Sequence, residues 1–156
     1  MVLGLLVQAS NRAYMPRLFA ELARDDPRRR VREVRRAYVY FSILAGAGVV
    51  VGSVAPSLAT PLLGEKFHAS AAFIPWLTCA VAVGGMCNVA AYYLIFARRT
   101  GWLSIATGLS AVVHVLASAL LIRTEGTIGA AHAFLVSQSC LFVLAWSFAG
   151  KAYPKP

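Results

Sequence analysis

The chain has 156 residues, of which 59% are hydrophobic and only 13% charged, and its mean hydropathy is +0.67. A soluble globular domain carries roughly 25% charged and 45–50% apolar residues, so too few polar side chains are present to cover a soluble fold, and a water-soluble enzyme is disfavoured. The net charge of +9 is concentrated, because nine of the fifteen basic residues lie between residues 12 and 36, beside a long apolar region. That placement is typical of the cytoplasmic flank of a membrane protein rather than of a nucleic-acid-binding surface.

Residues 1–36 form a segment of mixed composition before the apolar region. Residues 1–7 are apolar but too short for a signal peptide and lack a basic start, so they are similar to the end of a helix whose beginning is missing. Apolar residues then recur at helical spacing between residues 15 and 22. Asp26 followed by Pro27 predicts a new helix, because proline is favoured at the first helical position. We expect residues 1–36 to be a truncated helix end followed by a basic helical segment at the cytoplasmic surface.

Four uncharged stretches then reach the length of about 20 apolar residues that a membrane-spanning helix needs. They cover approximately residues 37–63, 71–97, 102–122 and 128–148. Helices are expected rather than isolated strands, because a chain in lipid must satisfy its backbone hydrogen bonds internally. The predicted fold is therefore an all-α membrane protein, with four transmembrane helices in residues 37–150 and a short cytoplasmic tail at residues 151–156.

The basic residues of the connections alternate from one to the next. An excess lies before the first span, in the Arg98-Arg99 connection, and in the tail with Lys151 and Lys155. The other two connections each hold one basic residue close to one acidic residue. Under the positive-inside rule, this alternation predicts a multi-pass protein with both ends in the cytoplasm.

The sequence contains no recognisable catalytic or metal-binding constellation. Glycine-rich phosphate loops and G-x-S-x-G elbows are absent, no C-x-x-C pair is present, and all six acidic residues lie in connections or flanks. His114 and His132 lie at predicted depths of about 12 and 6 Å in their spans, too far apart in level for two axial ligands. We expect neither enzyme activity, nor a metal, nor another cofactor.

A few residues inside the predicted spans are candidates for contacts between helices or with a substrate. Asn88, His114 and Gln138 are uncharged polar residues at depth. Such residues face other helices or a wet cavity, so they are candidates for interhelical hydrogen bonding or for a substrate path. Gly48 and Gly52 form a G-x-x-x-G pair that would allow close helix approach, although such pairs also occur by chance.

The basic stretch before the first span has three interpretations. Its arginines could anchor the topology, aided by attraction to anionic lipid of about 1 kcal/mol per residue. They could also attract a pyrophosphate-bearing lipid substrate; nucleic acid is the remote third interpretation. The candidate headgroup-attracting residues are Arg28, Arg29, Arg30, Arg35 and Arg36.

Three short motifs carry a family resemblance. The first is the loop region with Pro16, Leu18, Phe19 and Leu22, followed by an acidic and basic run. The second, at residues 64–70, is similar to a Gly-x-x-aromatic-x-x-small outer loop, and the third, at residues 126–133, to a G-x-x-G-A-A-x-A helix entry. In this combination the chain resembles the C-terminal part of polysaccharide or lipid-linked oligosaccharide flippases of the multidrug/oligosaccharidyl-lipid/polysaccharide exporter superfamily.

The resemblance implies a fragment of a larger transporter. Members of this family have twelve or more spans in two bundles, with the substrate path between the bundles, and this chain would supply the last four spans. The implied activity is export of lipid-linked glycan precursors, for lipopolysaccharide or exopolysaccharide, across the bacterial inner membrane. The implied partners are membrane lipids, the lipid-linked glycan, and either the missing N-terminal lobe or another copy of the chain. His132 stands at a variable position of the third motif and inherits no role.

Two alternatives remain open from the sequence. The chain could be a non-transporting small membrane protein, either an accessory subunit or an inactive gene fragment, since alternating access requires two lobes. It could also belong to a drug or metabolite exporter of the same superfamily. Reading the DNA upstream of Met1 would distinguish a truncation from a small protein, and complementation of a strain lacking a glycan flippase would test the substrate class.

Overall fold

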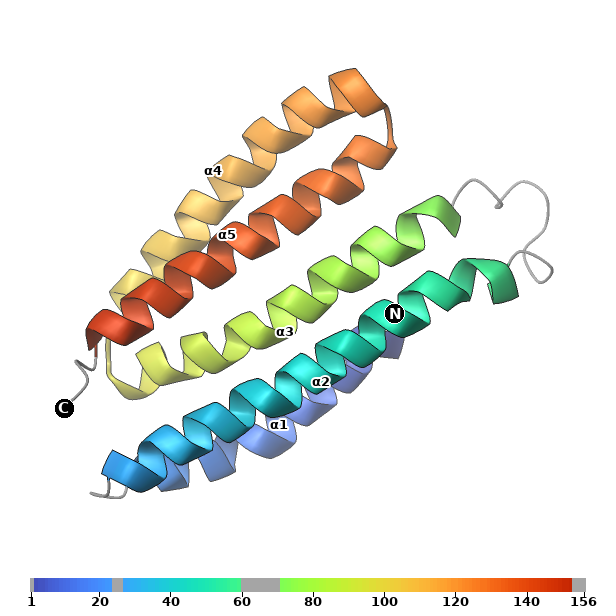
Figure 1. The fold of residues 1–156 in the computed structure, drawn as a ribbon. Helices are drawn as coiled ribbons and strands as arrows, with labels where there is room; N and C mark the ends of the chain where they lie inside the picture. Colours follow the sequence, from blue (N-terminus) through green and yellow to red (C-terminus); the bar gives the residue numbers. More distant parts are fainter. Residues whose placement is uncertain (1, 24–26, 60–70, 153–156) are drawn as a thin grey trace.

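The computed structural model describes residues 2–23, 27–59 and 71–152, and within these ranges the chain is helical and has no β-strand. The helices are α1 (Val2–Leu22), α2 (Pro27–Ala59), α3 (Ile74–Phe96), α4 (Thr100–Glu125) and α5 (Ile128–Ala152) (Figure 1). Pro27 is the first residue of α2, as predicted, whereas Asp26 lies outside the described residues.

Four helices in the described part of the chain are long and apolar enough to cross a membrane. The qualifying stretches are Val34–Val54, Ala71–Phe96, Thr100–Glu125 and Ile128–Ala152. Each overlaps one of the four predicted spans, so the all-α class is confirmed and a multi-pass membrane protein is indicated. The first stretch begins before the predicted residue 37, and the predicted end at residue 63 lies outside the described residues. The last two helices are longer than the predicted spans, because each continues into polar flanking residues that a hydropathy boundary leaves out.

The basic segment and the first span belong to one helix. α2 has 33 residues, which corresponds to a length of about 50 Å, whereas the hydrocarbon core of a bilayer is about 30 Å thick. Its apolar stretch, Val34–Val54, begins seven residues after the helix does. The arginines at the start of α2 are therefore held in line with the span, at one end of the bundle.

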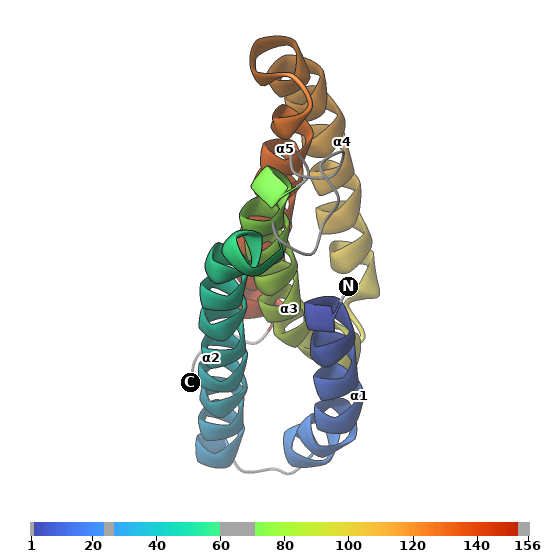
Figure 2. The ribbon, with the colours of Figure 1, turned by 90° about the vertical axis from the view of Figure 1, so that its right-hand side faces the viewer.

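The helices form a row in the order α2, α3, α5 and α4 (Figure 1). α3 and α5 run parallel to each other, and α2 and α4 flank them in the opposite direction. α1 runs antiparallel to α2, and Figure 2 shows α1 and α2 on either side of α3. We call "the basic end" the end where α2 begins, α3 turns into α4 and α5 finishes, since Arg35, Arg99 and Lys151 lie there.

α1 is attached to the bundle by side chains near the basic end. Leu18 is only 1% exposed, and the ring of Phe19 lies edge-on to that of Tyr92 with the centroids 6.4 Å apart. One turn earlier, Tyr14 packs against the buried Val89 of α3. The helical spacing predicted for this segment is thus confirmed and its apolar face contacts α3, while its location at the cytoplasmic surface stays a prediction.

Small residues line the contacts among the other helices. Between α3 and α5, Cys87, Ala90 and Ala145 form a buried cluster. Between α4 and α5, the buried Ser110 hydroxyl donates a hydrogen bond to the Ser137 carbonyl at 2.7 Å. Small side chains let helix backbones approach closely, which is how helices associate where lipid removes the usual hydrophobic driving force.

Candidate functional site

The three polar residues predicted inside the spans are not brought together. Gln138 of α5 lies over Gly84 of α3, where a Cβ on the glycine would be 3.0 Å from the Gln138 Oε1. The ring of His114 on α4 packs edge-on against Phe134 of α5, with the centroids 6.1 Å apart. Asn88 is half-buried on α3. Gln138 and His114 thus sit at two different helix contacts, and the role of all three residues as packing or substrate-path groups stays a prediction.

The His114 ring also carries a polar atom with an unmet hydrogen bond. Its Nδ1 is buried and has no hydrogen-bond partner within the described residues. A buried polar atom in that state costs free energy, so the residue marks a weak point of the α4–α5 contact.

Of the five candidate arginines, two have described side chains. Arg35 and Arg36 are exposed on α2, whereas the side chains of Arg28, Arg29 and Arg30 lie outside the described residues. Arg36 faces a groove between α1 and α2. Arg35 and Arg36, together with Arg32, also border a smaller groove on the outer face of α2.

The groove between α1 and α2, which we call "the α1–α2 groove", has a volume of about 610 Å³. Its described lining residues are Ala9, Ser10, Ala13, Tyr14 and Arg17 of α1, with Arg36 and Tyr40 of α2. Positions 10, 14 and 17 recur every three to four residues, so they lie on one face of α1. The described lining holds two cationic side chains and no acidic one.

Tyr14 and Tyr40 fix the width of the α1–α2 groove. Their rings stack almost parallel, at 12°, with the centroids 6.4 Å apart. The Tyr40 hydroxyl donates a hydrogen bond to the Ser10 hydroxyl at 3.2 Å, and Tyr14 is also packed against Val89 of α3. The two arginines are therefore mounted on helices that contact each other beside the groove and are attached to the core.

This arrangement suits an anionic ligand with further polar groups. A guanidinium offers a planar fork of donors that matches phosphate oxygens. The tyrosines add rings and hydroxyls, which bind groups that are partly apolar and partly polar. Sequence reasoning selected Arg36 but missed Arg17. The sequence shows that Ser10, Tyr14 and Arg17 share one face of a helix, but it does not show that this face lies opposite α2.

A second set of polar side chains joins three helices at the end opposite the basic end. The ring of Trp76, on α3, lies edge-on to that of His132, on α5, with the centroids 4.2 Å apart. The His132 Nδ1 pairs with the carboxylate of Glu125 at the end of α4. His132, expected to have no role, thus connects α3, α4 and α5.

The third sequence motif has a packing explanation. Gly126 ends α4 with a φ of 69°, a conformation that favours glycine. A Cβ on Gly129 would collide with the backbone of Leu121, so the glycine permits the tight α4–α5 contact. Ala131 and Ala133 are buried in the same region. The second motif, at residues 64–70, lies outside the described residues.

Comparisons with models of protein families, with curated proteins and with solved structures found no match. Function is therefore inferred from the grooves, charges and helix contacts of this chain.

Proposed function

We propose that this chain is the C-terminal part of a flippase that moves lipid-linked oligosaccharide or polysaccharide precursors across a bacterial inner membrane, with both chain ends in the cytoplasm. The observation that carries the proposal is the α1–α2 groove. There, Arg17 and Arg36 face one space from two different helices, beside Tyr14 and Tyr40.

The chemistry of the groove fits the headgroup of such a substrate. A pyrophosphate carries several negative charges, and two guanidinium groups on opposite walls can each bind it through paired hydrogen bonds. The sugars next to the pyrophosphate are polar and ring-shaped, and tyrosine side chains offer both a ring face and a hydroxyl. The lipid tail would stay in the bilayer beside the bundle.

The place of the groove along the bundle also supports the proposal. Arg36 lies near the start of the apolar stretch Val34–Val54, at the basic end. With the basic end in the cytoplasm, the groove would open at the level of the inner leaflet, where a precursor assembled in the cytoplasm is anchored. Arg32 on the outer face of α2 would raise the local concentration of anionic headgroups near its mouth.

A path for a substrate across the membrane needs a second group of helices on its other side. Transporters that alternate their access rock one bundle against another around a site between them. The four membrane-length helices form a row rather than a closed ring, with α1 beside α2 and α3 (Figure 1). We therefore propose that the missing lobe, or another copy of this chain, completes the path and that relative rotation exposes it first to the cytoplasm and then to the outer side.

Binding to the chain in lipid nanodiscs tests the proposal directly. The probe is a fluorescent polyprenyl-pyrophosphate disaccharide, titrated against the wild type and against Arg17→Gln and Arg36→Gln. A hydrogen bond to a charged group contributes about 1.5–3 kcal/mol, so each substitution should weaken binding about tenfold or more. Arg123→Gln, an exposed arginine in the last turn of α4, is the matched control and should bind as the wild type does.

Two results would contradict the proposal. Equal affinity of the wild type, Arg17→Gln and Arg36→Gln for the probe would show that the α1–α2 groove does not bind it. That result would favour a non-transporting membrane protein. Failure of the complete gene to restore glycan export in a strain lacking its flippase, together with restored resistance to a drug, would favour the exporter alternative.

A further inference from the structure

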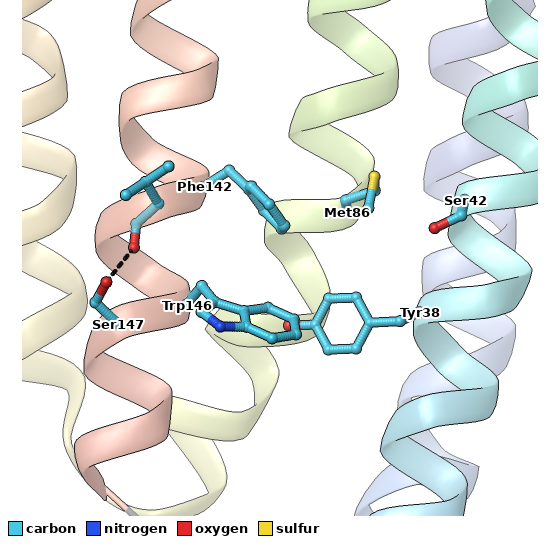
Figure 3. Close-up of a pocket in the computed structure, with 7 residues that line it drawn as sticks. Tyr38, Ser42, Met86, Phe142, Trp146 and Ser147 are labelled. Atoms are coloured by element: carbon cyan, nitrogen blue, oxygen red, sulfur yellow. Dashed lines mark hydrogen bonds between the residues drawn. The ribbon is translucent and has the colours of Figure 1, made fainter.

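A second groove crosses the face of α3 between α2 and α5. Its lining residues are Tyr38, Ser42, Met86, Phe142, Val143, Trp146 and Ser147, and its volume is about 410 Å³ (Figure 3). We call it "the Tyr38–Trp146 groove". In the described part of the chain, the backbones of α2 and α5 each lie against α3 but do not approach each other, so the groove is the space that they leave over α3.

Two aromatic rings connect the flanking helices at this groove. Tyr38 reaches from α2 and Trp146 from α5, and their rings meet at a centroid distance of 4.5 Å (Figure 3). The interior is apolar, with Met86 and Phe142 beside the rings. The groove is open to its surroundings, since Trp146 is 50% exposed and Val143 is 60% exposed.

On each flanking helix, one basic residue lies just beyond the residues that line the groove, on the side of the basic end. Arg35 precedes Tyr38 by three residues on α2, and Lys151 follows Ser147 by four residues on α5. Residues three or four apart share a helix face, and at 1.5 Å per residue the Cα of each basic residue lies about 4.5–6 Å along the helix from that of the lining residue. Both side chains are exposed. The apolar groove thus has a cationic group at the same end of each wall.

We propose that the Tyr38–Trp146 groove is a binding site for an anionic phospholipid, with one acyl chain in the groove and the phosphate between Arg35 and Lys151. Long basic side chains extend along apolar surface to reach the headgroup level, and tryptophan and tyrosine favour that same level. The site is separate from the α1–α2 groove and does not depend on the flippase function.

The charges at one end of the groove favour an anionic lipid over a protein helix. A narrow, flexible acyl chain can follow an open apolar groove of about 410 Å³. The phosphate of the same lipid carries the negative charge that Arg35 and Lys151 complement. The pair of charges at one end adds a selectivity for phosphate that a helix of another subunit would not need.

Native mass spectrometry of the delipidated chain tests the site. The probes are phosphatidylglycerol, phosphatidylcholine with the same acyl chains, and inorganic phosphate. We expect phosphatidylglycerol to bind most tightly. A basic residue near an anionic lipid surface contributes about fivefold in affinity. Arg35→Gln and Lys151→Gln should each therefore weaken phosphatidylglycerol binding about fivefold and together about 25-fold, while Arg123→Gln leaves it unchanged.

A second variant tests the acyl chain separately from the charge. Ser42→Phe places a ring in the groove from an exposed position, and it should weaken both phospholipids by the same factor. Ser104→Phe, the same change at an exposed position of α4, is the control, and circular dichroism verifies that both variants stay helical.

Three results would overturn the proposal: equal affinity for the two phospholipids, no effect of the Arg35 and Lys151 substitutions, or inorganic phosphate binding as tightly as phosphatidylglycerol. None of them bears on glycan binding at Arg17 and Arg36, so the two proposals fail independently.

Discussion

Thr78 of α3 lies directly against Gly52 of α2, so that a Cβ at position 52 would collide with the Thr78 hydroxyl. The hydroxyl is held in this position because its single proton is shared between the carbonyls of Ile74 and Pro75 in its own helix. The second glycine of the predicted G-x-x-x-G pair therefore has a packing role in the α2–α3 contact, and Gly48 is buried one turn before it.

Gly52→Ala should consequently destabilise the bundle by about 1–3 kcal/mol, the usual cost of excess volume in a packed contact. Gly46→Ala is the control, since nothing lies within 4 Å of a Cβ at that position. In a helix interior, alanine is favoured over glycine, so the control should be neutral or slightly stabilising. Unfolding in detergent measures both variants, and equal stability of the two would contradict the contact.

The His132 side chain should matter more to the stability of the bundle than the Glu125 carboxylate with which it pairs. The Glu125 pair is partly exposed, with side-chain exposures of 24% for His132 and 39% for Glu125, and such pairs contribute at most about 1 kcal/mol. His132→Ala also removes the ring contact with Trp76, which adds about 0.5–1.5 kcal/mol. We expect His132→Ala to lower the melting temperature more than Glu125→Gln does. Equal losses in the two variants would contradict a contribution from the ring contact.

Gln138 provides a test of packing against transport. Because its amide lies over Gly84, we expect Gln138→Leu, which has a similar volume, to leave both membrane abundance and glycan export of the complete gene product unchanged. Gln138→Ala would leave a void at the α3–α5 contact and should lower the stability by about 1–3 kcal/mol. Export lost in Gln138→Leu at normal abundance would instead place the residue on the substrate path.

The four spans followed from length and hydropathy alone, because lipid leaves a spanning backbone no alternative to the helix or the closed barrel. The start of α2 at Pro27 followed from the restricted backbone of proline. These properties depend only on residues that are near each other in the chain.

The candidate site depends on contacts between residues that are distant in the chain. This explains why only one of its two arginines was predicted. Arg36 was selected for its place in a basic run, but its meeting with Arg17 requires α1 to pack beside α2. α1 is held in that place by the contacts that Leu18 and Phe19 make with the rest of the bundle. The spacing of residues 15–22 predicts an apolar helix face but does not predict which helix that face contacts. Tyr38 and Trp146 are more than a hundred residues apart in the chain. Their rings meet only because α2 and α5 both pack on α3, one on each side of it.

The orientation of the bundle gives the last prediction. α4 and α5 have 26 and 25 residues, or nearly 40 Å at 1.5 Å per residue, so each is long enough to cross a hydrocarbon core of about 30 Å. Thr100 and Lys151 should then lie on one side of the membrane and Thr127 on the other, and from the basic residues we expect the first side to be the cytoplasm.

Cysteine labelling in intact cells measures this orientation. Thr127→Cys should react with a membrane-impermeant maleimide from outside, whereas Thr100→Cys and Lys151→Cys should react only after permeabilisation. All three positions are exposed, and the parent chain, whose Cys79, Cys87 and Cys140 are buried or half-buried, sets the background. Reaction of Thr100→Cys and Lys151→Cys from opposite sides would mean that α4 and α5 do not both cross. In that case the Tyr38–Trp146 groove, whose second wall is α5, would not lie at the headgroup level of the inner leaflet, and the position assigned to Lys151 beside an anionic headgroup would be lost.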